Sequence, residues 1–112
     1  MKNKIHYSKE SRRDMDEIWD YIAFELQNVS SAERVVGAIM DTVEQLEEFA
    51  ESGALLSSIA DVDSDYRFLV SGNYMVFYRV YESDVYVDRI LYGRRDYLRI
   101  LFENIIDNDA TE

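Results

Sequence analysis

Arginine and tyrosine side chains are concentrated in the second half of this sequence, where together they could bind phosphate groups or bases. A guanidinium group matches the oxygens of a phosphate, and an aromatic ring offers a face on which a base can stack. The same arginines could instead form internal ion pairs, since Asp88 precedes Arg89 directly. Both interpretations stay open. The residues concerned are Arg67, Arg79, Arg89, Arg94, Arg95 and Arg99, with Tyr66, Tyr74, Tyr78, Tyr92 and Tyr97.

Most other catalytic chemistries lack a necessary residue. Cysteine is absent, so Cys-His and thiolate metal sites cannot be assembled, and His6, the only histidine, is expected to be a structural or exposed residue and not a catalytic one. The four glycines are too scattered for a phosphate-binding loop or a dinucleotide fingerprint. Asp61, Asp63 and Asp65 alternate like the start of a calcium loop, but its central glycine and final glutamate are missing. We therefore expect no cofactor and no metal.

Length, composition and charge limit the class of protein. A chain of 112 residues with 47% hydrophobic side chains suits one folded domain. No apolar run resembles a signal peptide or could span a bilayer, so we expect a cytoplasmic protein without membrane contact. The net charge of −11 disfavours general nucleic-acid binding. Residues 66–102 alone are slightly basic, with 6 basic and 4 acidic side chains.

Two amphipathic helices are predicted in the first half of the chain. Apolar side chains recur at steps of three and four from Met15 to Leu26, and again from Ala32 to Ala50. Ser8 can cap the first helix, and residues 28–31 interrupt the pattern and supply a second cap. Gly53 offers the left-handed conformation that ends the second helix. The core between helices and sheet is expected to contain Trp19, Ile22, Val36, Ile39 and Val43.

The second half of the chain predicts a small antiparallel sheet. Aromatic and β-branched residues are concentrated in three segments that form a meander, and a short edge strand precedes the first helix. Gly72 and Asn73 suit a two-residue hairpin with positive φ, which sets Arg67 opposite Tyr78. The strands of the meander are residues 66–71, 74–81 and 85–92, and the edge strand is residues 4–7.

The predicted fold class is α+β, with the N-terminal helical hairpin on one face of the sheet and a short C-terminal helix over residues 94–102. Residues 1–102 form a single domain, and residues 103–112 form an acidic, frayed tail. The arginines should not all lie on the helix-covered face, because five guanidinium groups cannot be desolvated there without matching acids. This expectation concerns Arg67, Arg79, Arg89, Arg94 and Arg95.

The order of these elements and several short runs resemble the RelE/ParE toxins of bacterial type II toxin–antitoxin systems. The likeness covers nearly the whole chain, and the Tyr-Gly-Arg-Arg-Asp segment is its most specific part. It implies the toxin component of a module of the plasmid stabilisation type, neutralised by a cognate antitoxin encoded beside it. The runs are Ser8-Lys9-Glu10-Ser11, Ile18-Trp19-Asp20-Tyr21-Ile22, Tyr66-Arg67, Gly72-Asn73-Tyr74-Met75-Val76-Phe77-Tyr78-Arg79-Val80 and Arg89-Ile90-Leu91-Tyr92-Gly93-Arg94-Arg95-Asp96-Tyr97.

One branch of this family, the RelE kind, consists of ribosome-dependent mRNA endoribonucleases. They use basic residues on the sheet and a late tyrosine or histidine to assist attack on phosphate. In this branch the resemblance would make Arg67, Arg95 and Tyr97 the catalytic residues, and the ribosome and mRNA the partners. Other positions depart from the pattern, which favours a protein without nuclease activity. These departures are Leu69, Met75, Leu101 and Phe102.

The ParE-like branch fits the sequence better, and its members poison DNA gyrase by protein contact. The resemblance then implies two partners, the antitoxin and gyrase, and leaves a homodimer or a heterotetramer with the antitoxin open. A family member that has lost toxicity and only binds its partner is a further alternative, which the acidic net charge favours. The expected partner-binding residues are Tyr66, Arg67, Arg79, Arg89, Arg94, Arg95 and Tyr97.

Overall fold

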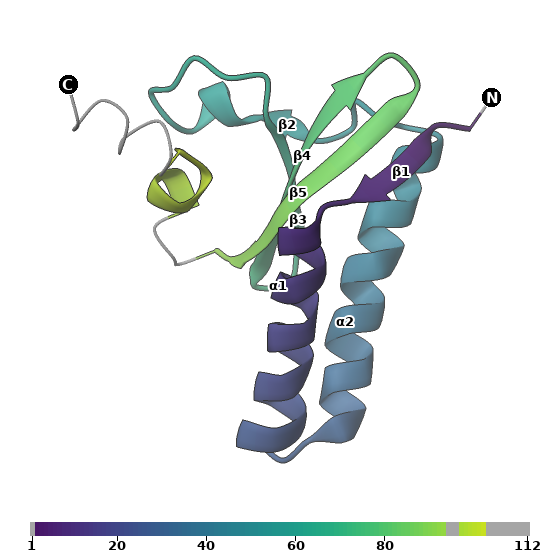
Figure 1. Ribbon diagram of the computed structural model, residues 1–112, viewed down its shortest axis with the longest axis vertical. Helices are drawn as coiled ribbons and strands as arrows, with labels where there is room; N and C mark the ends of the chain where they lie inside the picture. The colour runs from purple at the N-terminus through teal and green to yellow at the C-terminus, as the bar shows by residue number, and fades with distance from the viewer. Residues whose placement is uncertain (1, 94–96, 103–112) are drawn as a thin grey trace.

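The computed structural model describes residues 2–93 and 97–102 of the chain. No helix in this described part is long and apolar enough to cross a membrane. The expectations for Arg94, Arg95 and the tail at 103–112 lie outside the described residues. The elements in Figure 1 are β1 (Lys4–Tyr7), α1 (Lys9–Asp20), the π-helical turn η1 (Tyr21–Glu25), α2 (Val29–Glu44), the 3₁₀ turn η2 (Gln45–Glu47), β2 (Ala54–Leu55), the 3₁₀ turn η3 (Leu56–Ser58), β3 (Arg67–Ser71), β4 (Tyr74–Tyr81) and β5 (Asp84–Tyr92), followed by a C-terminal helix at residues 97–102.

The strands form one five-stranded sheet in the order β1-β5-β4-β3-β2, which confirms the α+β fold class. Hairpins join β3 to β4 and β4 to β5, so these strands are antiparallel as predicted. β1 pairs with β5 in parallel, however, and the short strand β2 was not foreseen. The sheet is therefore mixed, because two helices separate β1 from the meander and no hairpin dictates its direction.

The predicted hairpin register is confirmed. Arg67 lies opposite Tyr78, and the turn contains Gly72 with a φ of 59°. The second turn is one residue shorter than predicted, because Tyr81 pairs directly with Asp84. This tight turn is possible because its first residue, Glu82, adopts a φ of 55°.

The helix starts follow the predicted caps. The Ser8 side chain accepts a hydrogen bond from the amide of Ser11 at 2.9 Å, and the Asn28 side chain accepts one from the amide of Ser31 at 3.0 Å. Gly53 does not end the second helix, because α2 passes into η2 well before it. A Cβ at Gly53 would instead lie 2.5 Å from the hydroxyl oxygen of Tyr78, so glycine is needed for close packing.

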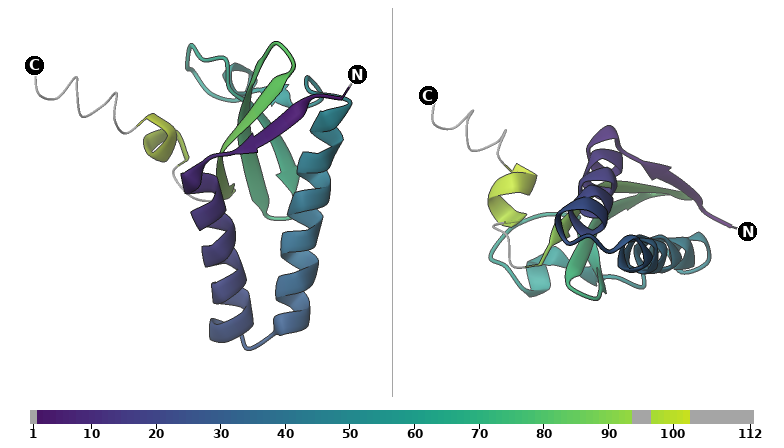
Figure 2. Two further views of the ribbon diagram at one scale, coloured as in Figure 1. Left: turned by 45° about the vertical axis from the view of Figure 1, so that its right-hand side comes forward. Right: turned by 90° about the horizontal axis from the view of Figure 1, so that it is seen from below.

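Both faces of the sheet are covered, although only one was expected to be. On the first face, Ile39 and Val43 of α2 and Leu46 of η2 pack against β4 and β5. On the second face, the C-terminal helix and the segment around Leu56 pack against Phe77 and neighbouring residues. Figure 2 shows the C-terminal helix on the side of the sheet away from α2.

The helices also extend well beyond the sheet, as Figure 1 shows, and we call α1, η1 and α2 the helical arm. Ile39 and Val43 are buried against the sheet as predicted. Ile22 is also buried, but between the helices with Ala23 and Ala32 and not against the sheet. The prediction is wrong for Trp19, which is half-buried and packs between the two helices, away from the sheet. It is also wrong for Val36, which is half-buried and belongs to no core cluster among the described residues.

Replacement of Ile39 by alanine should lower the free energy of unfolding by about 2–5 kcal/mol, since its side chain has 0% exposure. The neighbouring Met40 is 49% exposed, so Met40→Ala should change the value by less than about 0.5 kcal/mol. Urea titration of both variants measures the difference. A loss well below about 1 kcal/mol for Ile39→Ala would show that another face of α2 meets the sheet.

Candidate functional site

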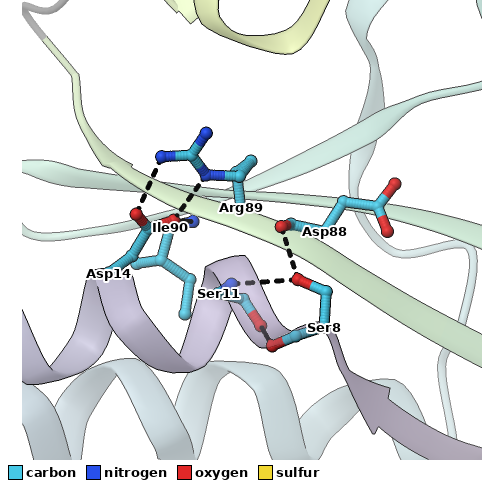
Figure 3. Close-up of polar contacts among 6 residues, drawn as sticks. All are labelled: Ser8, Ser11, Asp14, Asp88, Arg89 and Ile90. Atoms are coloured by element: carbon cyan, nitrogen blue, oxygen red, sulfur yellow. Dashed lines mark hydrogen bonds and ion pairs between the residues drawn. The ribbon is translucent and has the colours of Figure 1, made fainter.

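A buried carboxylate joins the helical arm to the sheet. Asp14 of α1 is only 7% exposed and accepts hydrogen bonds from Nε and Nη2 of Arg89, both at 2.8 Å (Figure 3). It also accepts the backbone N–H of Ile90 at 2.9 Å. The hydrogen bonds with Asp14 raise the pKa of Arg89 above its ordinary value. Arg89 is thus held as part of the scaffold.

The Ser8 side chain joins the start of α1 to the same strand. β1 pairs with β5 only as far as Val87. Beyond that point, the Ser8 hydroxyl donates to the carbonyl of Asp88 at 2.7 Å while it caps α1. The hydroxyl of Ser11, which is fully buried, donates to the carbonyl of Ser8 at 2.9 Å. The Ser8 side chain therefore satisfies a β5 carbonyl that β1 does not reach, as Asp14 satisfies the amide of Ile90.

A second ion pair lies on the face that the C-terminal helix covers. Arg79 Nε donates to Oδ2 of Asp88 at 2.9 Å, and its guanidinium carbon lies 5.3 Å from the centre of the Tyr66 ring. Burial, together with the neighbouring Asp88 carboxylate, raises the pKa of Tyr66 from 10.0 to about 12. Arg67, on the opposite face, donates to the backbone carbonyls of Gly53 at 2.8 Å and Glu51 at 3.3 Å.

The structure therefore favours the internal-pair interpretation of the described sheet arginines. Asp88 pairs with Arg79 rather than with its neighbour Arg89, which pairs with Asp14 instead. As predicted, the arginines do not all lie on the face that α2 covers, because Arg67 shares that face with Tyr78 and Arg79 lies on the other. Spacing along the sequence could not show the true partners.

The proposed catalytic trio is described only in part. Arg67 is engaged by backbone carbonyls, as above, and Arg95 lies outside the described residues. The ring of Tyr97 packs 5.3 Å from that of Phe77, within the apolar cluster of the second face. Among residues 2–93 and 97–102, no group of three histidine, aspartate or glutamate side chains could hold a metal ion.

A groove between the helical arm and the end of the sheet was missed from the sequence. Its volume is about 610 Å³, and its walls include Tyr21 and Leu26 on the arm and Tyr74 and Tyr92 on the sheet. Leu26 was expected to be buried but is 57% exposed. The helical period identifies the apolar face correctly but cannot tell where the sheet beneath it stops. Length gives no such signal, because the 16 residues of α2 span about 24 Å and the 9 residues of β5 span about 30 Å.

Removal of the Asp14 carboxylate should destabilise the fold strongly. Asp14→Ala leaves the guanidinium of Arg89 and the amide of Ile90 without their acceptor, which should cost about 2–4 kcal/mol. Asp16→Ala, at an exposed position of the same helix, should change stability by less than about 0.5 kcal/mol. Urea unfolding compares the two, and equal losses would contradict a structural role for Asp14.

High pH should weaken the fold through Tyr66. Because its pKa rises from 10.0 to about 12, the folded protein keeps a proton that the unfolded chain has already lost. The resulting stabilisation is fully present below pH 10.0 and is lost as the pH rises to about 12. The free energy of unfolding should therefore fall more steeply over this range for the original chain than for Tyr66→Phe. Parallel curves would refute this prediction.

Solved structures that share the fold include two toxin–antitoxin systems. A chromosomal ParDE toxin–antitoxin system from P. aeruginosa superposes with a TM-score of 0.68 at 22% identity, covering 80% of this chain and 95% of that chain. The RelBE2 toxin–antitoxin complex from Mycobacterium tuberculosis gives 0.61 at 14% identity, covering 82% and 99%. At such identities the likeness shows the fold alone. Among curated protein sequences, none matches this chain.

A family-level comparison extends to the sequence itself. The matching family is the ParE toxin of the type II toxin–antitoxin system, parDE, and the match runs over residues 5–97. This range includes the helical arm, the whole meander and the Asp14–Arg89 pair. Since the match covers most of the chain, this protein belongs to the ParE toxin family of type II toxin–antitoxin systems.

Proposed function

We propose that this toxin acts by binding DNA gyrase, that a cognate antitoxin neutralises it, and that it does not cut RNA. The ParE branch implies gyrase as the target. An antitoxin partner is supported by the family and by the two structural neighbours, which are themselves toxin–antitoxin systems. The choice between protein contact and RNA cleavage depends on what the sheet arginines do.

The engagement of these arginines is the observation that carries the proposal. An RNA-cleaving site needs cationic groups aimed at the position where charge develops on the phosphate. Here Arg79 and Arg89 each form an ion pair with a carboxylate of the chain, and Arg67 donates to backbone carbonyls. Their contacts lie at three separate places in the fold. No convergent cationic site results from these three residues.

The departures from the RNA-cutting pattern also have structural roles. Met75 is 9% exposed and belongs to the apolar cluster of the second face. Leu69 packs against the core of the first face. Leu101 and Phe102 of the C-terminal helix pack on the same cluster as Met75. These side chains hold the sheet and its covering elements together, and they supply no group that could transfer a proton.

Exposed apolar side chains on the helical arm suit a toxin that acts by protein contact. Tyr21 is 55% exposed and Phe24 is 68% exposed, and both lie on η1 where the arm has passed the sheet. Large exposed apolar groups are favoured at protein interfaces, where aromatic residues often provide most of the binding energy. The arm therefore offers surface that the fold itself does not use.

Expression without antitoxin should arrest growth, inhibit supercoiling by purified gyrase and leave translated mRNA intact. Primer extension on mRNA from induced cells and a supercoiling assay with the purified protein measure the two activities side by side. Phe24→Asp should weaken gyrase inhibition at least tenfold, whereas Val70→Asp, at a residue 60% exposed on β3, should not.

The outcomes separate the alternatives. Cleavage of mRNA on the ribosome with unaffected gyrase would reverse the choice of branch and make the protein an endoribonuclease. Continued growth with no response in either assay would identify a family member that only binds its partner. Equal effects of the two aspartate variants would show that the helical arm is not the contact surface.

A further inference from the structure

The strand β1 forms one edge of the sheet, and Figure 2 shows it along the outside of the molecule. The amides of Lys4 and Ser8 donate to backbone carbonyls on the β5 side of the strand, at 2.9 and 3.0 Å. Alternate residues of a strand turn their backbone groups to opposite sides, so those of Ile5 and Tyr7 point away from β5. In the described part of the chain, no other element pairs with this outer side of β1. An open edge of this kind can pair with a strand of another chain.

A hollow between β1 and α2 lies beside the open edge. Its volume is about 580 Å³, and Ile5, Tyr7 and Val43 line its apolar part. Glu44 also lines it, and burial together with this nearby carboxylate raises the pKa of Tyr7 above its ordinary value of 10.0. A chain that pairs with β1 can therefore also bury apolar side chains here, beside an acidic group.

The segments on the two sides of this hollow carry opposite charge. Residues 2–13, which include β1 and the start of α1, have five basic side chains, all exposed, and one acidic side chain. Residues 35–51, which include the end of α2 and η2, have five acidic side chains, four of them exposed, and no basic one. The basic residues are Lys2, Lys4, Lys9, Arg12 and Arg13, and the acidic residues of the second segment are Asp41, Glu44, Glu47, Glu48 and Glu51.

This pairing of charges suits a second copy of the same chain. Two molecules with a net charge of −11 repel each other, so they can meet favourably only where local charges are opposite. An interface about a two-fold axis contains the same patch from both copies, so each basic segment can meet the acidic segment of the other. Every contact that forms in such an interface forms twice.

We propose that two copies of this chain associate through their β1 strands, antiparallel about a two-fold axis, to form one continuous sheet. Ile5 and Tyr7 of each copy gain main-chain hydrogen bonds. Lys9, directly after β1, passes the beginning of the neighbouring strand, where the Asn3 amide donates to the Glu47 carbonyl at 2.7 Å. The basic segment of each copy thus lies along the acidic segment of the other.

The dimer would carry two helical arms, because the arm lies outside the paired strands. A two-fold axis perpendicular to the sheet leaves the α2-covered faces of both copies on the same side, so both arms extend from that side. Two linked copies of a contact surface bind a target with two equivalent sites more tightly than one copy does. The inference goes beyond the proposed function and does not depend on it, since it concerns the toxin alone.

Sedimentation equilibrium of the full chain without antitoxin measures the association. The original chain should dimerise reversibly, and Lys9→Glu should weaken the dimer at least tenfold, because like charges then face each other. Arg34→Glu changes the net charge equally at an exposed position near the opposite end of α2, and should change the dimer less than twofold. Addition of Glu44→Lys to Lys9→Glu should restore dimerisation, since the charges are then exchanged. Circular dichroism checks that all variants fold.

Amide exchange in dilute and concentrated samples locates the contact. Exchange at Ile5 and Tyr7 should slow at least tenfold in the concentrated sample, because their N–H groups gain partners. The amide of Val70 at the other side of the sheet is a matched control, since β2 ends beside Phe68 and leaves the next outward-facing group of β3 open. Its exchange should change less than twofold.

The possible failures are distinct. A chain that stays monomeric up to about 1 mM would overturn the inference. Slowing at Val70 in place of Ile5 and Tyr7 would locate the association at the other edge and overturn it too. Equal weakening by Lys9→Glu and Arg34→Glu would show that net charge alone governs the association, and would refute the β1 interface. Loss of gyrase or antitoxin binding would refute the proposed function and leave this inference standing.

Discussion

The contact between Asp14 and β5 is the constraint on which the arrangement of helices and sheet depends. β1 pairs with only the first part of β5, so the rest of that strand would expose backbone groups at the edge of the sheet. Asp14 accepts one of these amides and the guanidinium of Arg89 together. Since a buried carboxylate is tolerated only when its oxygens are hydrogen-bonded, the strand and the helix each make the other's position favourable.

The same contact determines the point along β5 at which the helical arm leaves the sheet. Ser8 fastens the first turn of α1 to β5, and Asp14 fastens the next part of the helix a few residues later. Beyond Asp14 the helix makes no further hydrogen bond to the strand among the described residues. The arm and the strand therefore diverge, and the groove opens between them.

Patterns that act over a few residues could be predicted from the sequence, and contacts between distant residues could not. The caps at Ser8 and Asn28 and the hairpin register at Arg67 follow from local chemistry, and the structure confirms them. Asp14 and Arg89 lie 75 positions apart, and nothing near either residue indicates its partner. Gly53 suggested a helix end, yet its lack of a side chain is needed because Tyr78 crosses it.

The net charge of −11 gives the toxin an acidic surface, and internal ion pairs occupy two of its few basic side chains. The chain has 12 lysines and arginines against 23 acidic residues. Arg79 and Arg89 each use their charge on an internal carboxylate, so each pair is neutral as seen by an approaching partner. Eight acidic side chains are exposed on the helical arm, where they repel acidic molecules. Charge on this surface therefore favours a partner whose contacting segment is basic over one whose segment is acidic.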